Sequence, residues 1–282
     1  VSPIIPPGIV LIIYALLSNV SVTKMFIAGY VPGALIAISL MITVAIISKK
    51  RKYVPVREKR ASLQEVFKQF KESIWALILP FVIILGMRIG IFTPTEAGAI
   101  AVVITTLIGI FIYKELKLTK FPEILKETVY GTSTVMFIII AANVFGAYLS
   151  WERIPFKLTN ILLEFSTSPW SLLLLINLIL LFVGMFIDGG AAMIILAPLL
   201  IPAALKLGID PLHLGIVMVV NIMIGGVTPP FGSMMFLTCS LLNIKLEEFM
   251  KEITPFIVAL LLVLFILTYI PDIVLFLPNL LS

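Results

Sequence analysis

The sequence predicts an all-α polytopic membrane protein, and three observations lead to this fold class. Of its 282 residues, 61% are hydrophobic and 12% are charged, whereas soluble chains carry about 25% charged residues. The apolar runs are long and lack the two-residue alternation of a membrane β-barrel. Pairs of prolines or glycines interrupt several of these runs and predict broken helices, and residues 170–206 form either one re-entrant hairpin or two spans.

Residues 1–48 are expected to hold a half-helix and a span. The apolar run Ile4–Leu17 is too short to cross about 30 Å of hydrocarbon, whereas Met25–Ser48 is long enough. The basic cluster KKRK at 49–52 then marks the cytoplasmic side by the positive-inside rule.

Residues 49–73 are expected to form a basic cytoplasmic loop and an interfacial arm helix. Within Ser62–Ser73, apolar residues recur on one helical face and lysines occupy the other, as in helices that lie on a membrane surface. Ser62 and Glu65 have the spacing of a capping box, so the arm helix should begin there.

Residues 74–168 are expected to form scaffold spans and a second interfacial helix. In order, we expect a span over Trp75–Gly90, a span over Ala97–Tyr113, an interfacial helix over Thr119–Thr128, a span over Gly131–Tyr148 and a connecting helix over Ile154–Phe165. The turn before the second span carries Thr93, Pro94 and Glu96, which suit the N-cap, the first position and the third position of a helix.

Residues 169–242 are expected to form a hairpin followed by a broken helix, and residues 243–282 to contain the last span. The expected hairpin arms are Leu172–Ile187 and Ala191–Leu205, joined at IDGG (187–190). The expected halves of the broken helix are Leu212–Ile224 and Met234–Leu242, joined at GGVTPPFG (225–232), and the last span is Ile253–Pro271. The whole pattern gives about six full crossings plus several half-length segments.

A stretch near the N-terminus recurs near the C-terminus. Each copy contains a Pro-Pro pair, an apolar half-helix, a short polar corner and a long span with a proline. At an offset of 223 and without a gap, the aligned pairs are Pro6 with Pro229, Pro7 with Pro230, Phe26 with Phe249, and Pro32 with Pro255. Paired breaks in inverted repeats point to a carrier with its binding site at the membrane midplane. Because most of the first copy would precede Val1, we expect this chain to be a C-terminal portion of a larger subunit.

The second break is expected to bind a cation. The Pro229–Pro230 pair removes two backbone donors, and freed carbonyls are tolerated in lipid where they line a cavity or bind an ion. The half-helix that ends at Gly225 adds partial negative charge, and the loop carbonyls around Gly226 with the Thr228 hydroxyl supply hard oxygens for Na⁺. The half-helix that begins near Gly232 offers a positive N-terminus to an anion. A proline kink that is packed against protein is the alternative.

The expected hairpin tip carries a carboxylate. Asp188 is the only acidic residue between Glu164 and Asp210. It suits a cation ligand or proton carrier within the membrane, and it suits equally well the N-cap of the segment that follows. Gly189 gives the tip conformational freedom, and Gly184 allows close packing or exposes a carbonyl.

Three isolated asparagines lie in apolar segments, at Asn143, Asn177 and Asn221. Hydrogen bonding between helices is the expected role of such residues. Asn221 lies one turn before Gly225 and is therefore the one best placed for the ion site.

Several function classes do not fit this composition. Cys239 is the only cysteine and His213 the only histidine, which excludes an intrachain disulfide and a His/Cys metal cluster. The chain lacks GxxxxGK[ST] and a catalytic acid–base pair, so we expect neither ATP hydrolysis nor another enzymatic activity, and no cofactor beyond a coupling ion. The net charge of +5 lies in loops beside apolar segments, which indicates membrane topology and not nucleic-acid binding. A purely structural scaffold would not need paired broken helices.

Four motifs resemble those of a known family. They are SPIIPPG at 2–8, GIFTPTEAGA at 90–99, FIDGGAAMIILAPLLIPAALKLGIDPLHLG at 186–215 and GGVTPPFG at 225–232. With these motifs the whole chain resembles the large membrane subunit (DctM-like, or M subunit) of tripartite ATP-independent periplasmic (TRAP) transporters.

The resemblance implies an elevator-type secondary transporter of the wider ion-transporter superfamily, located in the inner membrane of a bacterium or archaeon. It implies import of small organic anions, such as C4-dicarboxylates or sialic acids, driven by a Na⁺ gradient. A periplasmic binding protein would deliver the substrate, and a small four-helix membrane subunit would brace the large one. A carrier of the same superfamily that works without a binding protein is the alternative.

The resemblance also implies positions for the sites. Gly184, Gly225 and Thr228, with Gly226, would contribute to one Na⁺ site, and Ser2–Ile5 would be the remnant of another. Substrate would lie between the hairpin tips, near residues that the motifs place at the tip and at the two breaks: Asp188, Gly189, Pro229, Pro230, Pro6 and Pro7.

Overall fold

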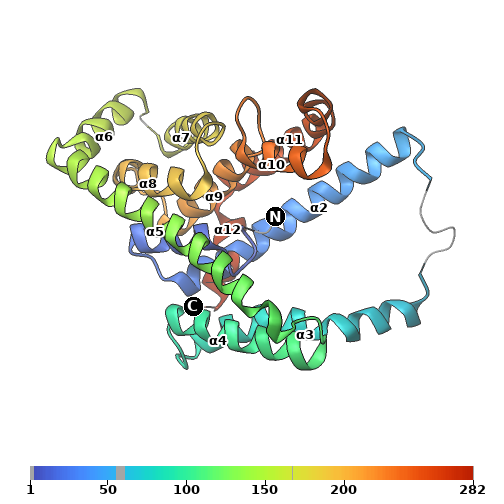
Figure 1. Cartoon of the computed structure of the whole chain (residues 1–282). Helices are drawn as coiled ribbons and strands as arrows, with labels where there is room; N and C mark the ends of the chain where they lie inside the picture. Colours follow the sequence, from blue (N-terminus) through green and yellow to red (C-terminus); the bar gives the residue numbers. More distant parts are fainter. Residues whose placement is uncertain (1–2, 55–60, 167, 282) are drawn as a thin grey trace. The chain divides into compact units, whose positions relative to one another are not determined.

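The structure is a computed structural model that describes residues 3–54, 61–166 and 168–281, without the side chains of Ala142, Asn143, Ser150 and Ser233. Within these ranges every regular element is a helix (Figure 1). The α-helices are α1 (Ile9–Ser18), α2 (Val22–Lys50), α3 (Leu63–Arg88), α4 (Pro94–Leu107), α5 (Phe121–Trp151), α6 (Ile154–Phe165), α7 (Pro169–Gly184), α8 (Gly189–Lys206), α9 (Pro211–Gly225), α10 (Ser233–Leu242), α11 (Leu246–Tyr269) and α12 (Pro271–Leu281). A π-helical turn, η1 (Ile108–Ile112), extends α4, and a 3₁₀ turn, η2 (Leu118–Lys120), precedes α5.

The length and composition of these helices confirm an all-α, multi-pass membrane protein. Among the described residues, six helices are long and apolar enough to cross a membrane. The count rises to seven if α6 and α7, which meet at a bend of 119°, form one broken span. The helices α1, α9 and α12 are apolar but shorter.

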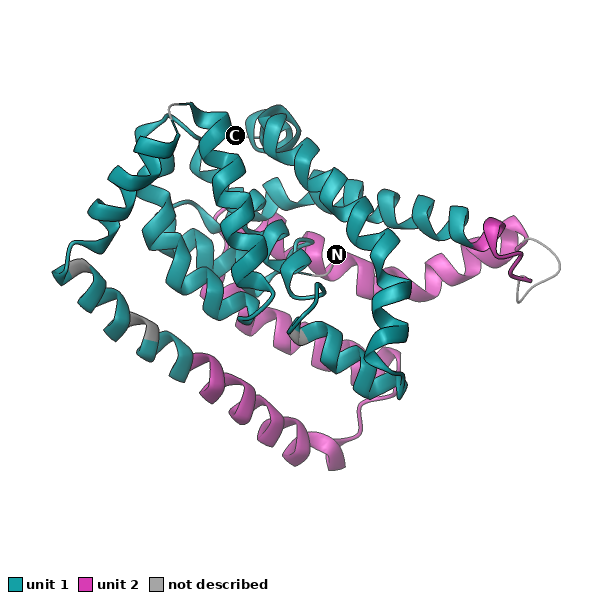
Figure 2. Ribbon diagram, turned by 90° about the horizontal axis from the view of Figure 1, so that it is seen from above, with its two compact units in different colours: residues 1–47, 137–282 teal, residues 48–136 magenta. Residues whose placement is uncertain are grey.

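The chain divides into two compact units (Figure 2). Unit 1 comprises Val1–Ile47 and Phe137–Ser282, and unit 2 comprises Ser48–Met136. Unit 1 contains both Pro-Pro breaks and the predicted hairpin, whereas unit 2 contains α3 and α4.

Unit 1 is built around α9. From His213 to Gly225 every residue of this helix except Met223 is buried, and α9 packs against α1, α7, α8, α11 and α12. The apolar surface of a helix in a membrane protein is covered either by lipid or by other helices, and in α9 it is covered by helices. The first half of the second broken helix therefore lies at the centre of its unit.

Unit 2 begins with the predicted helix caps. The Ser62 hydroxyl accepts from the Glu65 amide at 3.2 Å, and the Glu65 carboxylate accepts from the Ser62 amide at 3.1 Å. Thr93 and Glu96 form the same reciprocal pair at the start of α4, with Pro94 at its first position. The capping box at Ser62 and the Thr93 cap were predicted from the sequence and are confirmed, and the structure adds the return bond that the Thr93 amide donates to the Glu96 carboxylate.

Two helix boundaries differ from the sequence expectation. The arm helix over Ser62–Ser73 and the span that follows it form the single helix α3, and Thr119–Thr128 and its following span join in the same way in α5. Neither junction contains a proline, so the backbone hydrogen bonds continue through it.

The end of the last span also differs from the expectation. This span ends at Tyr269 and a further helix, α12, starts at Pro271, a position where proline is well tolerated.

The two repeat copies share local structure, with a change of register. The helices α1 and α10 each have ten residues, and each follows a glycine N-cap, at Gly8 and Gly232. Each ends at an asparagine in the left-handed conformation, Asn19 (φ 55°) and Asn243 (φ 54°). These positions correspond at an offset of 224, so the gapless alignment at 223 is wrong over this stretch. The extra residue is Phe231, which lies between the second Pro-Pro pair and its glycine.

Candidate functional site

The C-terminal ends of α7 and α9 meet at two glycines. A methyl group on Gly225 would lie 2.6 Å from both the Cα and the carbonyl carbon of Gly184, and one on Gly184 would lie 3.1 Å from the Cα of Gly225. Both residues are buried. The structure therefore brings together two residues that are far apart in the sequence, and the two backbones approach as closely as glycine permits.

This meeting point is electrostatically suited to a cation. A helix C-terminus carries roughly half a negative charge, and its last carbonyls have no partner within the helix. Within the described part of the chain, the carbonyl oxygens of Gly184 and Thr228 accept no backbone hydrogen bond. Two converging C-termini thus leave carbonyl oxygens available as ligands for an ion.

The loop after α9 folds back on itself. The Thr228 amide donates to the Gly225 carbonyl at 2.9 Å, and the Met234 amide donates to the Gly226 carbonyl at 3.0 Å. The Thr228 hydroxyl donates to the Ile224 carbonyl at 2.6 Å. A hydroxyl that donates one hydrogen bond keeps its oxygen lone pairs, so Thr228 can still coordinate a cation.

Gly232 closes this loop at its other end. A methyl group at this position would lie 2.6 Å from the Gly226 carbonyl oxygen and 2.9 Å from that of Thr228. The preceding peptide bond between Pro229 and Pro230 is cis, as is the one between Pro6 and Pro7. The loop is therefore compact, and α10 begins directly beside the carbonyls of the break.

Asp188 is the N-cap of α8. Its Oδ1 accepts from the Gly190 amide at 3.0 Å, and its carbonyl accepts from the Ala192 amide at 2.8 Å. The side chain is exposed. The structure confirms the capping role of Asp188, while its role as a cation ligand or proton carrier, which one residue can combine with capping, stays a prediction.

The hairpin tip lies against the second break. A methyl group on Gly189 would lie 2.8 Å from Met223 Cε, near the end of α9. The rings of Phe186 and Phe231 lie 5.6 Å apart between centroids and so connect the tip to the residue after Pro230. These two phenylalanines were not among the predicted site residues, although Phe186 directly precedes IDGG and Phe231 lies within GGVTPPFG.

The first break packs mainly on α2. A methyl group on Gly33 would lie 2.8 Å from Ile5 Cγ1, and one on Gly29 would overlap the Ile4 carbonyl oxygen. The described contacts do not bring Ile5, Pro6 or Pro7 against Gly184 or Gly225. Ser2 lies outside the described residues.

A cavity of about 310 Å³ nevertheless borders both breaks. Pro3 and Ile4 line it from the first copy, and Val227 and Met234 line it from the second. Because the lining is almost entirely apolar, it does not suit a small carboxylate.

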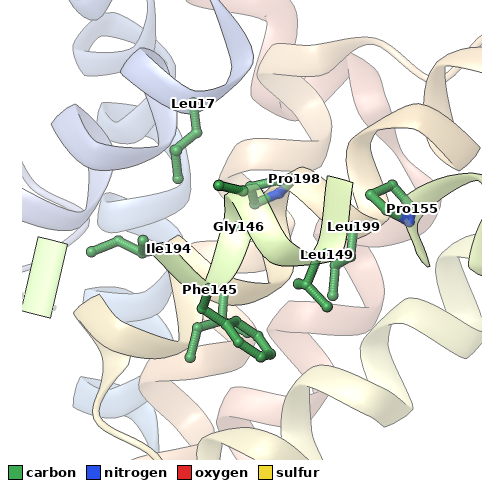
Figure 3. A pocket seen from close by; sticks show the side chains of 10 residues that line it. Leu17, Phe145, Gly146, Leu149, Pro155, Ile194, Pro198 and Leu199 are labelled. Atoms are coloured by element: carbon green, nitrogen blue, oxygen red, sulfur yellow. The ribbon is translucent and has the colours of Figure 1, made fainter. Parts of the chain in front are cut away.

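A second pocket of about 230 Å³ lies among α1, α5, α6 and α8 (Figure 3). Leu17, Phe145, Ile194 and Pro198 are among the residues around it. No charged side chain lines this pocket, so we assign no anion to it either.

The usual requirement for a side-chain metal site is a cluster of His, Cys, Asp or Glu. Nowhere in residues 3–54, 61–166 and 168–281 do three His, Cys, Asp or Glu side chains come together. A cation at the glycine pair would therefore take backbone and hydroxyl oxygens, which are the ligands preferred by hard cations.

Comparison with known proteins gives one family. The profile of the family described as "Tripartite ATP-independent periplasmic transporter, DctM component" matches residues 1–273. The C4-dicarboxylate TRAP transporter large permease protein DctM of Pseudomonas aeruginosa is 41% identical over 276 residues, which are 98% of this chain and 64% of that protein. The sialic acid TRAP transporter large permease protein SiaM of Vibrio cholerae is 39% identical over 99% of this chain and 65% of its own length. The isethionate TRAP transporter permease protein DctMQ of Oleidesulfovibrio alaskensis is 38% identical over 96% of this chain and 43% of its own length.

These relatives are named as permease proteins of transporters and not as enzymes, as the sequence predicted. The chain spans less than two thirds of the length of each of the three.

Proposed function

This chain belongs to the DctM family of tripartite ATP-independent periplasmic transporters, and from that membership we propose that it acts in a Na⁺-coupled secondary transporter that imports small organic anions. We base the proposed Na⁺ coupling on one observation, which is that the C-terminal ends of α7 and α9 meet at Gly184 and Gly225. Half-helix C-termini and unwound carbonyls are the groups that coordinate coupling ions in secondary transporters. The proposed ligands are backbone oxygens of Gly184, Gly225 and Gly226 together with the Thr228 hydroxyl.

The proposed substrate is a small organic anion. Relatives are named for a C4-dicarboxylate, for sialic acid and for isethionate, all of which carry negative charge. We propose that the anion lies between the hairpin tip at Asp188–Gly189 and the Pro229–Pro230 break. Because the Asp188 carboxylate repels anions, we propose that the positive end of the α10 helix dipole is the better partner.

The proposed transport cycle moves one body relative to another, as in an elevator. The division into two units supports this, because both breaks and the hairpin belong to unit 1 while α3 and α4 belong to unit 2. We further propose that a periplasmic binding protein delivers the substrate, that a small four-helix membrane subunit assists, and that the assembly lies in the inner membrane.

Uptake into proteoliposomes tests the proposal. The purified transporter is reconstituted with its binding protein, and labelled C4-dicarboxylate and labelled sialic acid are supplied separately. Replacing external Na⁺ with choline should reduce uptake of the transported anion to background. Unchanged uptake in choline would refute Na⁺ coupling, and full uptake without the binding protein would instead favour a binding-protein-independent carrier.

A further inference from the structure

A buried chain of hydrogen bonds joins α7, α9 and α11. Asn221 Nδ2 donates to Asn177 Oδ1 at 2.7 Å, and Asn177 Nδ2 donates to Thr268 Oγ1 at 2.9 Å. The Thr268 hydroxyl in turn donates to the Leu264 carbonyl at 2.7 Å. The exposed fractions of Asn177, Asn221 and Thr268 are 5%, 0% and 0%, so the chain lies wholly inside the unit.

Asn177 and Asn221 lie on the same interface between α7 and α9 as Gly184 and Gly225. Asn177 precedes Gly184 by two helical turns on α7, and Asn221 precedes Gly225 by one turn on α9. Residues at these spacings share one face of a helix. The two contacts therefore follow each other along one α7–α9 interface, in which the helices run in the same direction.

The two contacts are close enough to be coupled mechanically. At a rise of 1.5 Å per residue they lie about 6 Å apart along α9 and about 10 Å apart along α7. The rest of the interface is apolar, with Ile176 and Leu180 buried on α7 and Val217 on α9. Apolar contacts alone tolerate axial sliding, whereas a buried amide–amide hydrogen bond has one register.

The hydrogen-bonding state of Asn221 argues against a role in stability alone. Besides Asn177, its Nδ2 reaches the Val217 carbonyl at 2.9 Å, but its Oδ1 is buried with no partner among the described residues. Leaving a buried acceptor unpaired costs stability, which offsets much of what the hydrogen bonds contribute. An apolar side chain of similar volume would hold the helices together at least as well.

We propose that Asn177 and Asn221 are positioning residues for the cation site. By fixing the axial register of α7 and α9, they set the distance at which Gly184 and Gly225 meet and at which the loop carbonyls converge. They do not themselves touch the ion. The proposal rests on the proposed function, because it presupposes that Na⁺ binds at the glycine pair.

The test separates stability from ion affinity. The purified transporter is heated in increasing NaCl, with choline chloride keeping the ionic strength constant, because an ion that binds only the folded state raises the melting temperature in proportion to its affinity. The variant is N177L/N221L, in which both partners of the hydrogen bond are replaced together. Its melting temperature in choline should be close to that of the unchanged protein, while the Na⁺ concentration for half-maximal stabilisation should rise about fivefold or more.

The matched control is Y14F, which removes a hydrogen bond of similar strength on another interface of α9. The Tyr14 hydroxyl donates to the Pro211 carbonyl at 2.7 Å, at the end of α9 opposite to Gly225. This variant should lower the melting temperature slightly and leave the half-saturating Na⁺ concentration unchanged.

Each remaining outcome is decisive. A half-saturating Na⁺ concentration within twofold of the unchanged protein would overturn the positioning role, whatever the melting temperature. If N177L/N221L does not fold, the N221S variant takes its place, because the serine hydroxyl is too short to reach Asn177. The same twofold threshold in the half-saturating Na⁺ concentration then applies. If the unchanged transporter shows no stabilisation by Na⁺, the proposed function itself fails and the positioning role falls with it.

Discussion

Replacing Gly225 with alanine should push the ends of α7 and α9 apart. The new Cβ would lie 2.6 Å from the Cα and carbonyl carbon of Gly184. Backbone atoms cannot rotate away as a side chain can, so the two helix ends must separate by about 0.8 Å to restore ordinary contact. Overpacking of this kind costs about 1–3 kcal/mol of folding stability.

The same displacement should weaken Na⁺ binding. Ion sites hold their ligand distances to within about 0.2 Å, so a shift of about 0.8 Å disrupts a site to which both helix ends contribute. We expect the half-saturating Na⁺ concentration to rise about tenfold or more, measured from melting temperatures in NaCl against choline chloride.

Gly146 provides the control for this experiment. It lies inside α5, in unit 1, and a methyl group there would have nothing within 4 Å. Gly146→Ala should therefore be neutral or should stabilise by up to about 1 kcal/mol, because alanine is the better helix former. If Gly225→Ala and Gly146→Ala give the same melting temperature and the same Na⁺ response, the close contact with Gly184 does not hold the site together and the reasoning is refuted.

Substitutions at three further positions test the loop, the hairpin tip and the packing at the start of α9. Thr228→Val removes the proposed hydroxyl ligand and should raise the half-saturating Na⁺ concentration about fivefold to tenfold. Thr228→Ser keeps the hydroxyl and should leave this concentration unchanged. Equal values for the two variants would exclude the hydroxyl as a Na⁺ ligand. Asp188→Ala should cost about 1 kcal/mol in thermal unfolding because it removes the N-cap of α8, and Asp188→Asn should restore most of that loss; a larger loss with asparagine would show that charge and not capping matters. Tyr14→Phe should cost about 1 kcal/mol in thermal unfolding because the bond to Pro211 is lost and the ring stays packed, and an unchanged melting temperature would contradict this.

The features that the sequence predicted well are local. The capping box at Ser62, the Thr93 cap and the connecting helix Ile154–Phe165 agree with the structure. Each is determined by residues within one or two turns, and these interactions are the same wherever the helix is placed. Sequence reasoning is strongest where the physical cause lies within a few residues.

Helix boundaries were harder to predict where no residue breaks the backbone. The change from a polar to an apolar surface near Ser73 marks where the environment of α3 changes, but it does not end the helix. Amphipathicity describes what surrounds a helix, whereas its end requires a cap, a glycine or a proline. A similar change of surface near Thr128 led to the expected break within α5, where the helix in fact continues.

Long-range pairing could not be derived from periodicity. Asn177 and Asn221 are 44 residues apart, and both lie in segments that are apolar on every side, so no amphipathic stripe shows which faces meet. The proximity of Gly184 and Gly225 came from family resemblance and not from spacing. The single extra residue Phe231 likewise escaped detection, because Phe26 with Phe249 and Pro32 with Pro255 also match at an offset of 223, which hides a shift that is confined to the half-helix.

The contact between Gly184 of α7 and Gly225 of α9 limits which positions of this protein tolerate substitution. No side chain takes part in the contact and every alternative to glycine is larger, so substitution at Gly184 or Gly225 itself offers no gradual way to adjust it. The exposed hairpin tip and Phe231, by contrast, consist of side chains that mutation can reshape freely. In the proposed transporter, a lineage that adapts to a different anion can therefore change the residues of the hairpin tip and Phe231 while it keeps Gly184 and Gly225.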